Sequence, residues 1–273
     1  MQTSALTHKA AGIDWYCELR GSGPTIVLIP SGEGDCANFA AVADALCDEF
    51  TVLTFDMPGF SRSSAPPEFG IVTAQMLGDQ VAALVSSLGL APATFYGCSS
   101  GGQAVLSLAA DHPDLVRNAI IHEAALGKDV AWDELKEERY AQMNSLDDAG
   151  ITQACKDVFR NVMNSNPAAW DALGTEYHNR LAKNYVTWVR HYFCAGGAAE
   201  RSYNRDELSR RPIAWSIGGF SEIWFMIGNL RVAQRADIGV EIFKCRHFPQ
   251  VEIPNVLAAH IRKHAEQHRA MDG

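Results

Sequence analysis

The sequence predicts a protein of the α/β class in which a mostly parallel sheet is flanked by helices and interrupted by an inserted helical cap. Short β-rich runs alternate with helical spacing in the first half, a long helical segment follows, and strand-like runs then return. Such alternation is typical of a parallel sheet covered by helices. With 273 residues, 47% of them hydrophobic, the chain can bury one substantial core.

The predicted strands are short and rich in apolar side chains. In the first half they are residues 13–19, 25–29, 51–55, 93–96 and 118–122. Between them, residues 39–46 and 74–88 place apolar side chains at intervals of three and four, as helices packed on a sheet require. Strand-like runs at 213–217 and 238–243 and a helix over about 254–268 then resume the core.

Residues 127–210 are predicted to form the cap. The strand signal disappears there, and the segment is rich in aromatic side chains, among them Trp132, Tyr140, Phe159, Trp170, Tyr177, Tyr185, Trp188 and Tyr192. Residues 1–126 and 211–273 are then the core. Because apolar pockets with a few polar anchors suit bulky aromatic ligands, we expect the cap to select the substrate.

Charge and composition exclude several classes of protein. A net charge of -9 argues against binding to a nucleic-acid backbone. The sequence begins without the basic and apolar segments of a signal peptide, and no run is long enough to span a membrane, so we expect a cytoplasmic protein. Seven scattered cysteines lack the paired spacing of a zinc site. We expect no metal and no organic cofactor, and the sequence leaves a homodimer open.

The segment 96–102, Tyr-Gly-Cys-Ser-Ser-Gly-Gly, carries the strongest chemical signal. It follows a predicted strand, opens a helical run and matches the G-x-S-x-G nucleophile elbow of the α/β-hydrolase fold. The turn is tight, so its neighbours must be small, and the three glycines meet that demand. Ser99 is the predicted nucleophile. Ser100 is predicted to offer its backbone N–H to an oxyanion hole.

The second oxyanion donor is predicted in the loop 30–34, after the strand 25–29. Gly32 is the candidate, although the glycines of this loop can also serve a turn alone. Cys98 lies between strand and nucleophile, where we expect its side chain to point away from the cleft and to pack in the core.

A serine nucleophile needs a base, which this fold carries after its last strand. His247 follows the strand 238–243 and fits that place. Five other histidines have ordinary surface positions: His8, His112, His260, His264 and His268. His178 and His191 fall in the cap, where a structural role is the usual one, and the sequence leaves open whether they line the pocket.

The triad acid has two candidates. Many proteins of this fold carry it after the strand that follows the cap, but position 221 is Ser221 and the nearest carboxylate is Glu222. Glu123 ends the strand 118–122, where a buried carboxylate needs a partner such as the histidine. We favour Glu123, which gives the chain order serine, acid, histidine of this fold.

These residues resemble those of the fungal-type zearalenone hydrolases, lactonases that open the macrocyclic ester of a resorcylic acid lactone. The most specific matching pieces are residues 55–63, 97–101, 122–123, 183–185 with Trp188, and 247–249. The resemblance implies an acid directly after a histidine, which matches Glu123. It also implies an oxyanion hole formed by Gly32 and Ser100, and a ligand hydrogen bond from Trp188. Ser31 and Glu33 depart from the Asp and Leu expected there.

The sequence therefore predicts a serine hydrolase that opens a macrocyclic aromatic lactone of the zearalenone type through Ser99, Glu123, His247 and an acyl-enzyme. The alternatives are a carboxylesterase, a C–C bond hydrolase with the same triad, and a receptor-like protein that only captures a small molecule. Epoxide hydrolases and haloalkane dehalogenases are disfavoured because they use Asp at the elbow.

Overall fold

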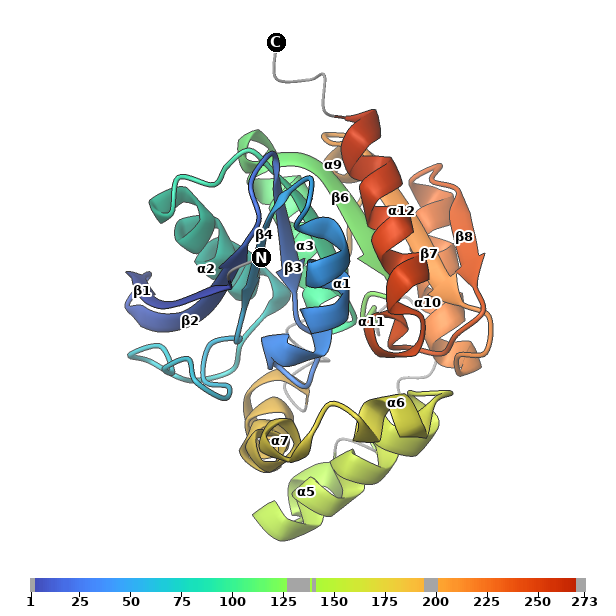
Figure 1. Cartoon of the computed structure of the whole chain (residues 1–273). Coiled ribbons are helices and arrows are strands. Elements are labelled where there is room, and N and C mark those ends of the chain that lie inside the picture. The colour runs from blue at the N-terminus through green and yellow to red at the C-terminus, as the bar shows by residue number, and fades with distance from the viewer. Residues whose placement is uncertain (1–2, 127–137, 139–140, 194–200, 269–273) are drawn as a thin grey trace.

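A computed structural model describes residues 3–126, 138, 141–193 and 201–268. Its centre is an eight-stranded sheet of order β1-β2-β4-β3-β5-β6-β7-β8 (Figure 1). The strands are β1 (Ser4–Ala10), β2 (Ile13–Arg20), β3 (Thr25–Ile29), β4 (Thr51–Phe55), β5 (Ala93–Cys98), β6 (Val116–His122), β7 (Ile213–Gly218) and β8 (Val240–Phe243). β2 pairs antiparallel with β1 and β4, and every other neighbouring pair is parallel. The predicted fold class is confirmed.

The strand β1 is absent from the prediction because its side chains carry no core-facing pattern. All of its residues are exposed or half-buried except Ala10 at its end. Its backbone pairs with β2 across a tight turn at Ala11 and Gly12, which both have positive φ. Such left-handed turns match the twist of a hairpin. This edge strand is therefore held mainly by backbone hydrogen bonds.

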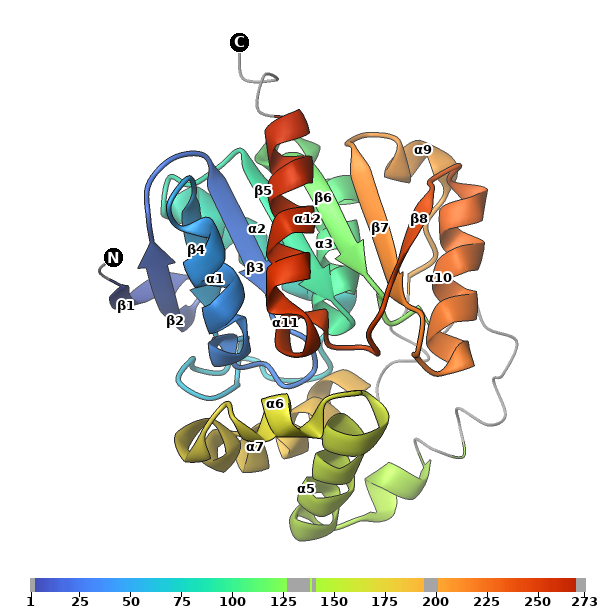
Figure 2. The same ribbon diagram turned by 45° about the vertical axis from the view of Figure 1, so that its right-hand side comes forward.

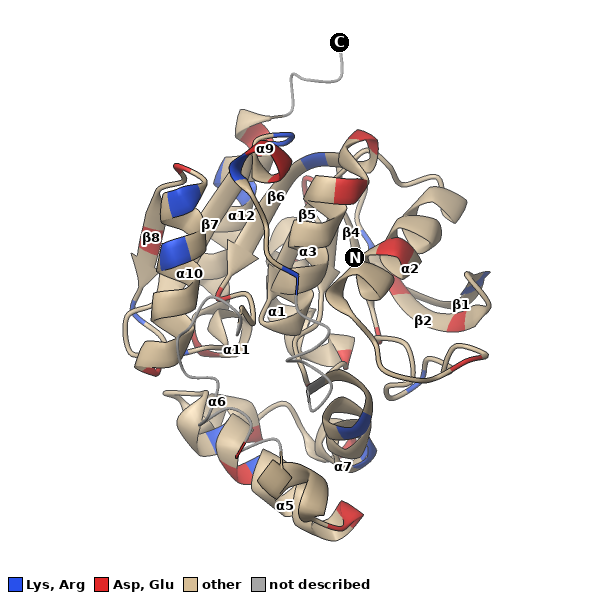
Figure 3. Cartoon of the chain, turned by 180° about the vertical axis from the view of Figure 1, so that it is seen from behind, with Lys and Arg blue, Asp and Glu red and all other residues tan. Residues whose placement is uncertain are grey.

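Helices cover both faces of the sheet. The core helices are α1 (Ala40–Leu46), α2 (Ala74–Ser87), α3 (Ser100–Asp111), α9 (Arg205–Leu208), α10 (Ile223–Arg235), α11 (Pro249–Glu252) and α12 (Pro254–Gln267), with short 3-10 turns at Cys36–Phe39 and Pro113–Leu115. α1 and α12 pack together on one face (Figure 2). α2, α3 and α10 lie on the other (Figure 3). Within the described residues, no helix has the length and apolarity to cross a membrane.

A separate helical layer lies over the carboxyl ends of the parallel strands (Figure 2). It contains α5 (Asp148–Asp157), α6 (Pro167–Asp171), α7 (Thr175–Thr187) and π-helical turns at Val158–Val162 and Trp188–Phe193. Here "cap helices" means these elements. α9 instead contacts α3, so the cap boundaries at 127 and 210 stay a prediction. Trp132 and Tyr140 lie outside the described residues.

Candidate active site

Ser99 lies at the sharp turn between β5 and α3. Its backbone has φ 57° and ψ -119°, a strained conformation for a residue with a side chain. The turn is possible only because its neighbours are glycine. A Cβ at Gly97 would lie 2.2 Å from the carbonyl oxygen of Gly101, and a Cβ at Gly101 would lie 2.5 Å from that of Ile29. The structure thus has the tight strand-to-helix turn expected from the sequence.

The two residues predicted to form the oxyanion hole lie at the same edge of the sheet. Ser100 is the first residue of α3, so its N–H belongs to a helix N-terminus, where partial positive charge gathers. Gly32 lies in the loop after β3, directly against the cap: a Cβ there would lie 2.5 Å from Nε1 of Trp188. No side chain fits at Gly32 unless the indole moves.

Glu123 and His247 are in direct contact. Glu123 Oε2 accepts a hydrogen bond from His247 Nδ1 at 2.6 Å, and both side chains are almost fully buried. Oε1 accepts from the N–H of Gly218 at 2.8 Å, and Oε2 also accepts from Ser221 Oγ at 2.9 Å. Burial alone would raise the pKa of Glu123, but His247, His122 and Ser221 hold that pKa below its ordinary value.

Ser221 occupies the place after β7 where the sequence-based expectation looked for an acid. It donates to Glu123 instead of replacing it. The neighbouring Glu222 is half-buried at the start of α10. The described structure therefore joins His247 to Glu123 and not to Glu222. The supporting role of Ser221 was missed, since a serine at this position carries no signal of its own.

The loop that carries His247 is held from two sides. The backbone N–H of His247 donates to the carbonyl oxygen of Met163, just after the first π-helical turn of the cap, at 3.0 Å. Its carbonyl oxygen accepts from Cys98 Sγ at 3.0 Å, so Cys98 points into the core as expected. The imidazole ring of His247 stacks on the ring of Phe225, with 4.0 Å between the ring centroids. His247 Nε2 is buried, and within the described residues it has no hydrogen-bond partner.

Comparison with known proteins identifies the family. A family model described as the α/β hydrolase fold matches residues 24–149. A zearalenone hydrolase of Bionectria ochroleuca is 34% identical over 271 residues, which are 98% of this chain and 100% of the relative. A zearalenone hydrolase of Cladophialophora bantiana is 38% identical over 255 residues, 92% of each chain. The chain belongs to the zearalenone hydrolase family.

The predicted enzyme class is therefore confirmed: the chain is a hydrolase. A solved esterase from Thermogutta terrifontis superposes on it with a TM-score of 0.71 at 21% identity, covering 98% of this chain and 99% of the esterase. At that identity, the likeness confirms the fold alone.

The hydrolase buries a second carboxylate beside Gly32. Glu33 is fully buried and accepts hydrogen bonds from Trp170 Nε1 at 2.9 Å and from Tyr177 Oη at 2.7 Å. Its backbone carbonyl accepts from Asn184 Nδ2 at 2.8 Å. Burial raises the pKa of Glu33, and its hydrogen-bond donors offset part of that rise. All three donors belong to the cap helices, so Glu33 fastens the cap to the loop after β3.

A third buried carboxylate strengthens the same attachment. Asp35 accepts from Arg180 Nε on α7 at 2.6 Å and from Ser61 Oγ at 2.6 Å. Burial opposes the charge of Asp35, but these donors hold its pKa below the ordinary value. From the sequence, Glu33 is recognised only as a departure from the family pattern, and Asp35 is not recognised at all. The residues that donate hydrogen bonds to them lie far away in the chain.

The two cap histidines of the hydrolase have structural partners. His178 Nε2 is 3.1 Å from the carbonyl oxygen of Trp170. His191 Nδ1 is 2.9 Å from the carbonyl oxygen of Gly70, and its ring stacks on Phe69 at 3.9 Å. These contacts are of the structural kind that the sequence favours for both residues.

His122, directly before Glu123, is a buried neutral group. Its Nδ1 is 3.0 Å from Ser216 Oγ. Burial lowers the pKa of His122 to about 4, and the nearby Glu123 only partly opposes that shift. At neutral pH the ring therefore carries no charge. The ring that contacts the Glu123 carboxylate directly is that of His247.

We expect His122 to make the hydrolase less stable in acid. An unfolded histidine titrates near 6.5, so between about pH 6.5 and 4 the unfolded chain binds more protons than the folded one. The free energy of unfolding should then fall as pH drops through this window, by on the order of 3 kcal/mol from this residue. Urea unfolding of the wild type and His122→Asn at a series of pH values measures the difference in slope.

His112→Asn serves as the control, because His112 lies part-exposed beside Asp79. It should keep the wild-type slope, while His122→Asn should flatten it. His260, whose burial likewise lowers its pKa to about 4, maintains a residual slope in every variant. Equal slopes for wild type and His122→Asn would contradict the expectation.

Proposed function

We propose that this hydrolase opens the ester bond of a macrocyclic aromatic lactone of the zearalenone type, with Ser99, His247 and Glu123 as its catalytic triad. The buried 2.6 Å contact between Glu123 and His247, at the sheet edge where Ser99 turns into α3, carries the proposal. The two relatives named zearalenone hydrolases support the substrate class, because they match nearly the whole chain, cap included.

In the proposed reaction, Ser99 Oγ attacks the ester carbonyl carbon while its proton passes to His247 Nε2. That nitrogen is suited to the task because Nδ1 is already engaged by Glu123. The buried carboxylate keeps the imidazole oriented and stabilises the imidazolium that forms. Its other hydrogen bonds, from Gly218 and Ser221, fix the carboxylate in place.

The tetrahedral intermediate carries a negative oxygen, which the N–H groups of Gly32 and Ser100 are proposed to stabilise. As the intermediate collapses, the ring C–O bond breaks and His247 returns the proton to the departing alkoxide. In a lactone that alcohol stays attached to the acyl group. Water, activated by His247, then attacks the acyl-enzyme and releases a hydroxy acid together with free Ser99.

Trp188 is the proposed anchor for the aromatic part of the substrate. Its indole lies against Gly32, and Phe159 packs edge-on against it at 5.1 Å. The indole thus stands beside the proposed oxyanion hole. An indole offers a broad apolar face and one N–H donor, a combination suited to a phenolic or carbonyl oxygen on a flat ring.

Ser99→Ala should lower kcat for lactone opening by roughly 10⁵-fold, because it removes the covalent nucleophile. Ligand binding should persist. Ser100→Ala is the matched control: it keeps the backbone N–H and should change kcat little. Steady-state kinetics, with fluorescence titration of bound lactone, measure both effects. An active Ser99→Ala beside an inactive Ser100→Ala would mean that the neighbouring serine is the nucleophile.

Glu123→Gln should lower kcat by about 10³ to 10⁴-fold, since the neutral amide no longer stabilises the imidazolium of His247. Glu222→Gln, a similar change at the half-buried start of α10, should cost far less. Initial rates at saturating lactone distinguish the two carboxylates. Equal losses, or a loss at Glu222 alone, would move the acid to the position after β7.

Trp188→Ala should reduce kcat/KM for zearalenone by about 10 to 100-fold through the lost ring contact and hydrogen bond. A short p-nitrophenyl ester should suffer less, because it lacks the phenolic oxygen that the indole N–H is proposed to bind. Trp188→Phe retains an aromatic face without the N–H and should fall between. The lactone proposal fails, and the hydrolase is a carboxylesterase, if the wild type prefers the short ester. It fails equally if Trp188→Ala lowers kcat/KM by the same factor for both substrates.

A further inference from the structure

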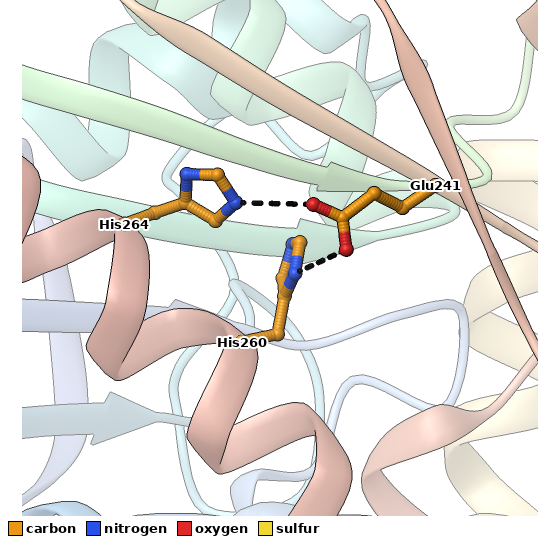
Figure 4. Close-up of side chains that lie close together, drawn as sticks. All are labelled: Glu241, His260 and His264. Carbon is orange, nitrogen blue, oxygen red and sulfur yellow. Dashed lines mark ion pairs between the residues drawn. The ribbon is translucent and has the colours of Figure 1, made fainter.

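Outside the proposed catalytic residues, Glu241 on β8 faces two histidines of α12 (Figure 4). His260 and His264 are four residues apart, which places both side chains on one side of the helix. The sequence-based expectation of a surface position is wrong for His260, whose side chain is only 4% exposed. It is buried because that side of α12 packs against the sheet.

Each of the two imidazole rings has a nitrogen near one oxygen of the Glu241 carboxylate. His260 Nδ1 lies 3.3 Å from Glu241 Oε2, and His264 Nε2 lies 3.6 Å from Oε1. One ligand atom from each residue falls within 4.8 Å of the others. Two ligands about 2.1 Å from a tetrahedral zinc ion are roughly 3.4 Å apart. The 3.6 Å contact is too long for a hydrogen bond but close to this spacing.

We propose that Glu241, His260 and His264 bind one divalent transition-metal ion, with zinc as the best fit, and that the ion fastens β8 to α12. Two imidazoles and a carboxylate form a donor set that zinc uses in proteins, whereas calcium and magnesium require oxygen ligands throughout. Glu241 is 47% exposed, so water can complete the coordination. The site is distinct from the proposed triad.

The present partner of the carboxylate is a competing cation. Lys263 Nζ lies 3.2 Å from Glu241 Oε1, and a bound ion would displace this ammonium group. Within the described residues, His264 Nε2 is buried and has no hydrogen-bond partner.

Such an ion would restrain the chain just before the proposed base. Phe243, two residues after Glu241, packs edge-on against His260 at 5.0 Å. The chain then passes through residues 244–246 to His247. β8 is the edge strand of the sheet and pairs on one side only, with β7. A metal ion would therefore stabilise this edge without taking part in ester cleavage.

The test is zinc binding to the full chain, prepared without a histidine tag and stripped of metal by EDTA. Isothermal titration with zinc chloride at pH 7.5 should give one ion per chain. His264→Gln and Glu241→Gln should each weaken binding at least tenfold, since each removes one of three ligands. Both positions are part-exposed, so the variants should fold. His112→Gln, at a histidine paired with Asp79, should bind like the wild type.

A thermal assay gives a second readout. Zinc at about 100 times its Kd should raise the Tm of the wild type by roughly 5 °C, and the shift should vanish in the two ligand variants. Lys263→Gln should bind zinc as tightly as the wild type or more so, because it removes the competing cation. Unchanged affinity in both ligand variants, or an equal loss in Lys263→Gln, would overturn the proposal.

Discussion

The burial of the Glu123 carboxylate is the constraint on which the site depends. A buried charge without partners costs several kcal/mol, so the groups that donate to Glu123 must meet where it lies. They come from Gly218 at the end of β7, from Ser221 in the turn that follows, and from His247 in the loop after β8. One side chain thus fixes how the ends of three neighbouring strands are arranged, and neutral His122 beside it adds no competing charge.

The same principle attaches the cap. Glu33 and Asp35 follow the proposed oxyanion glycine, and both are buried among donors from the cap helices. Separating the cap from the core would expose or unpair both carboxylates together. The loop after β3 is therefore attached to α6 and α7 of the cap, and Trp188 lies against Gly32. One short loop therefore connects the cap, which is proposed to bind the substrate, with the proposed oxyanion hole.

Sequence patterns predict correctly those elements that depend on residues close together in the chain. β3 and β4 have the predicted bounds, and the elbow around Ser99 follows from small residues between a strand and a helix. The acid remained a choice between two carboxylates, because spacing along the chain does not reveal that Ser221 turns toward Glu123. The burial of His260 could not be predicted either, because the sequence of its polar helix does not show that Glu241 on β8 is its partner.

The order of the proposed triad along the chain bears on how this family diversifies. Ser99 and Glu123 directly follow the adjacent strands β5 and β6 before the cap, whereas His247 comes after it. Recombination that exchanges the cap therefore leaves the serine and the acid as one inherited unit. The incoming segment has to reproduce the backbone contact between Met163 and His247 and to supply donors for the buried carboxylates of Glu33 and Asp35. A cap that meets these demands can change the proposed substrate pocket while the proposed triad stays unaltered.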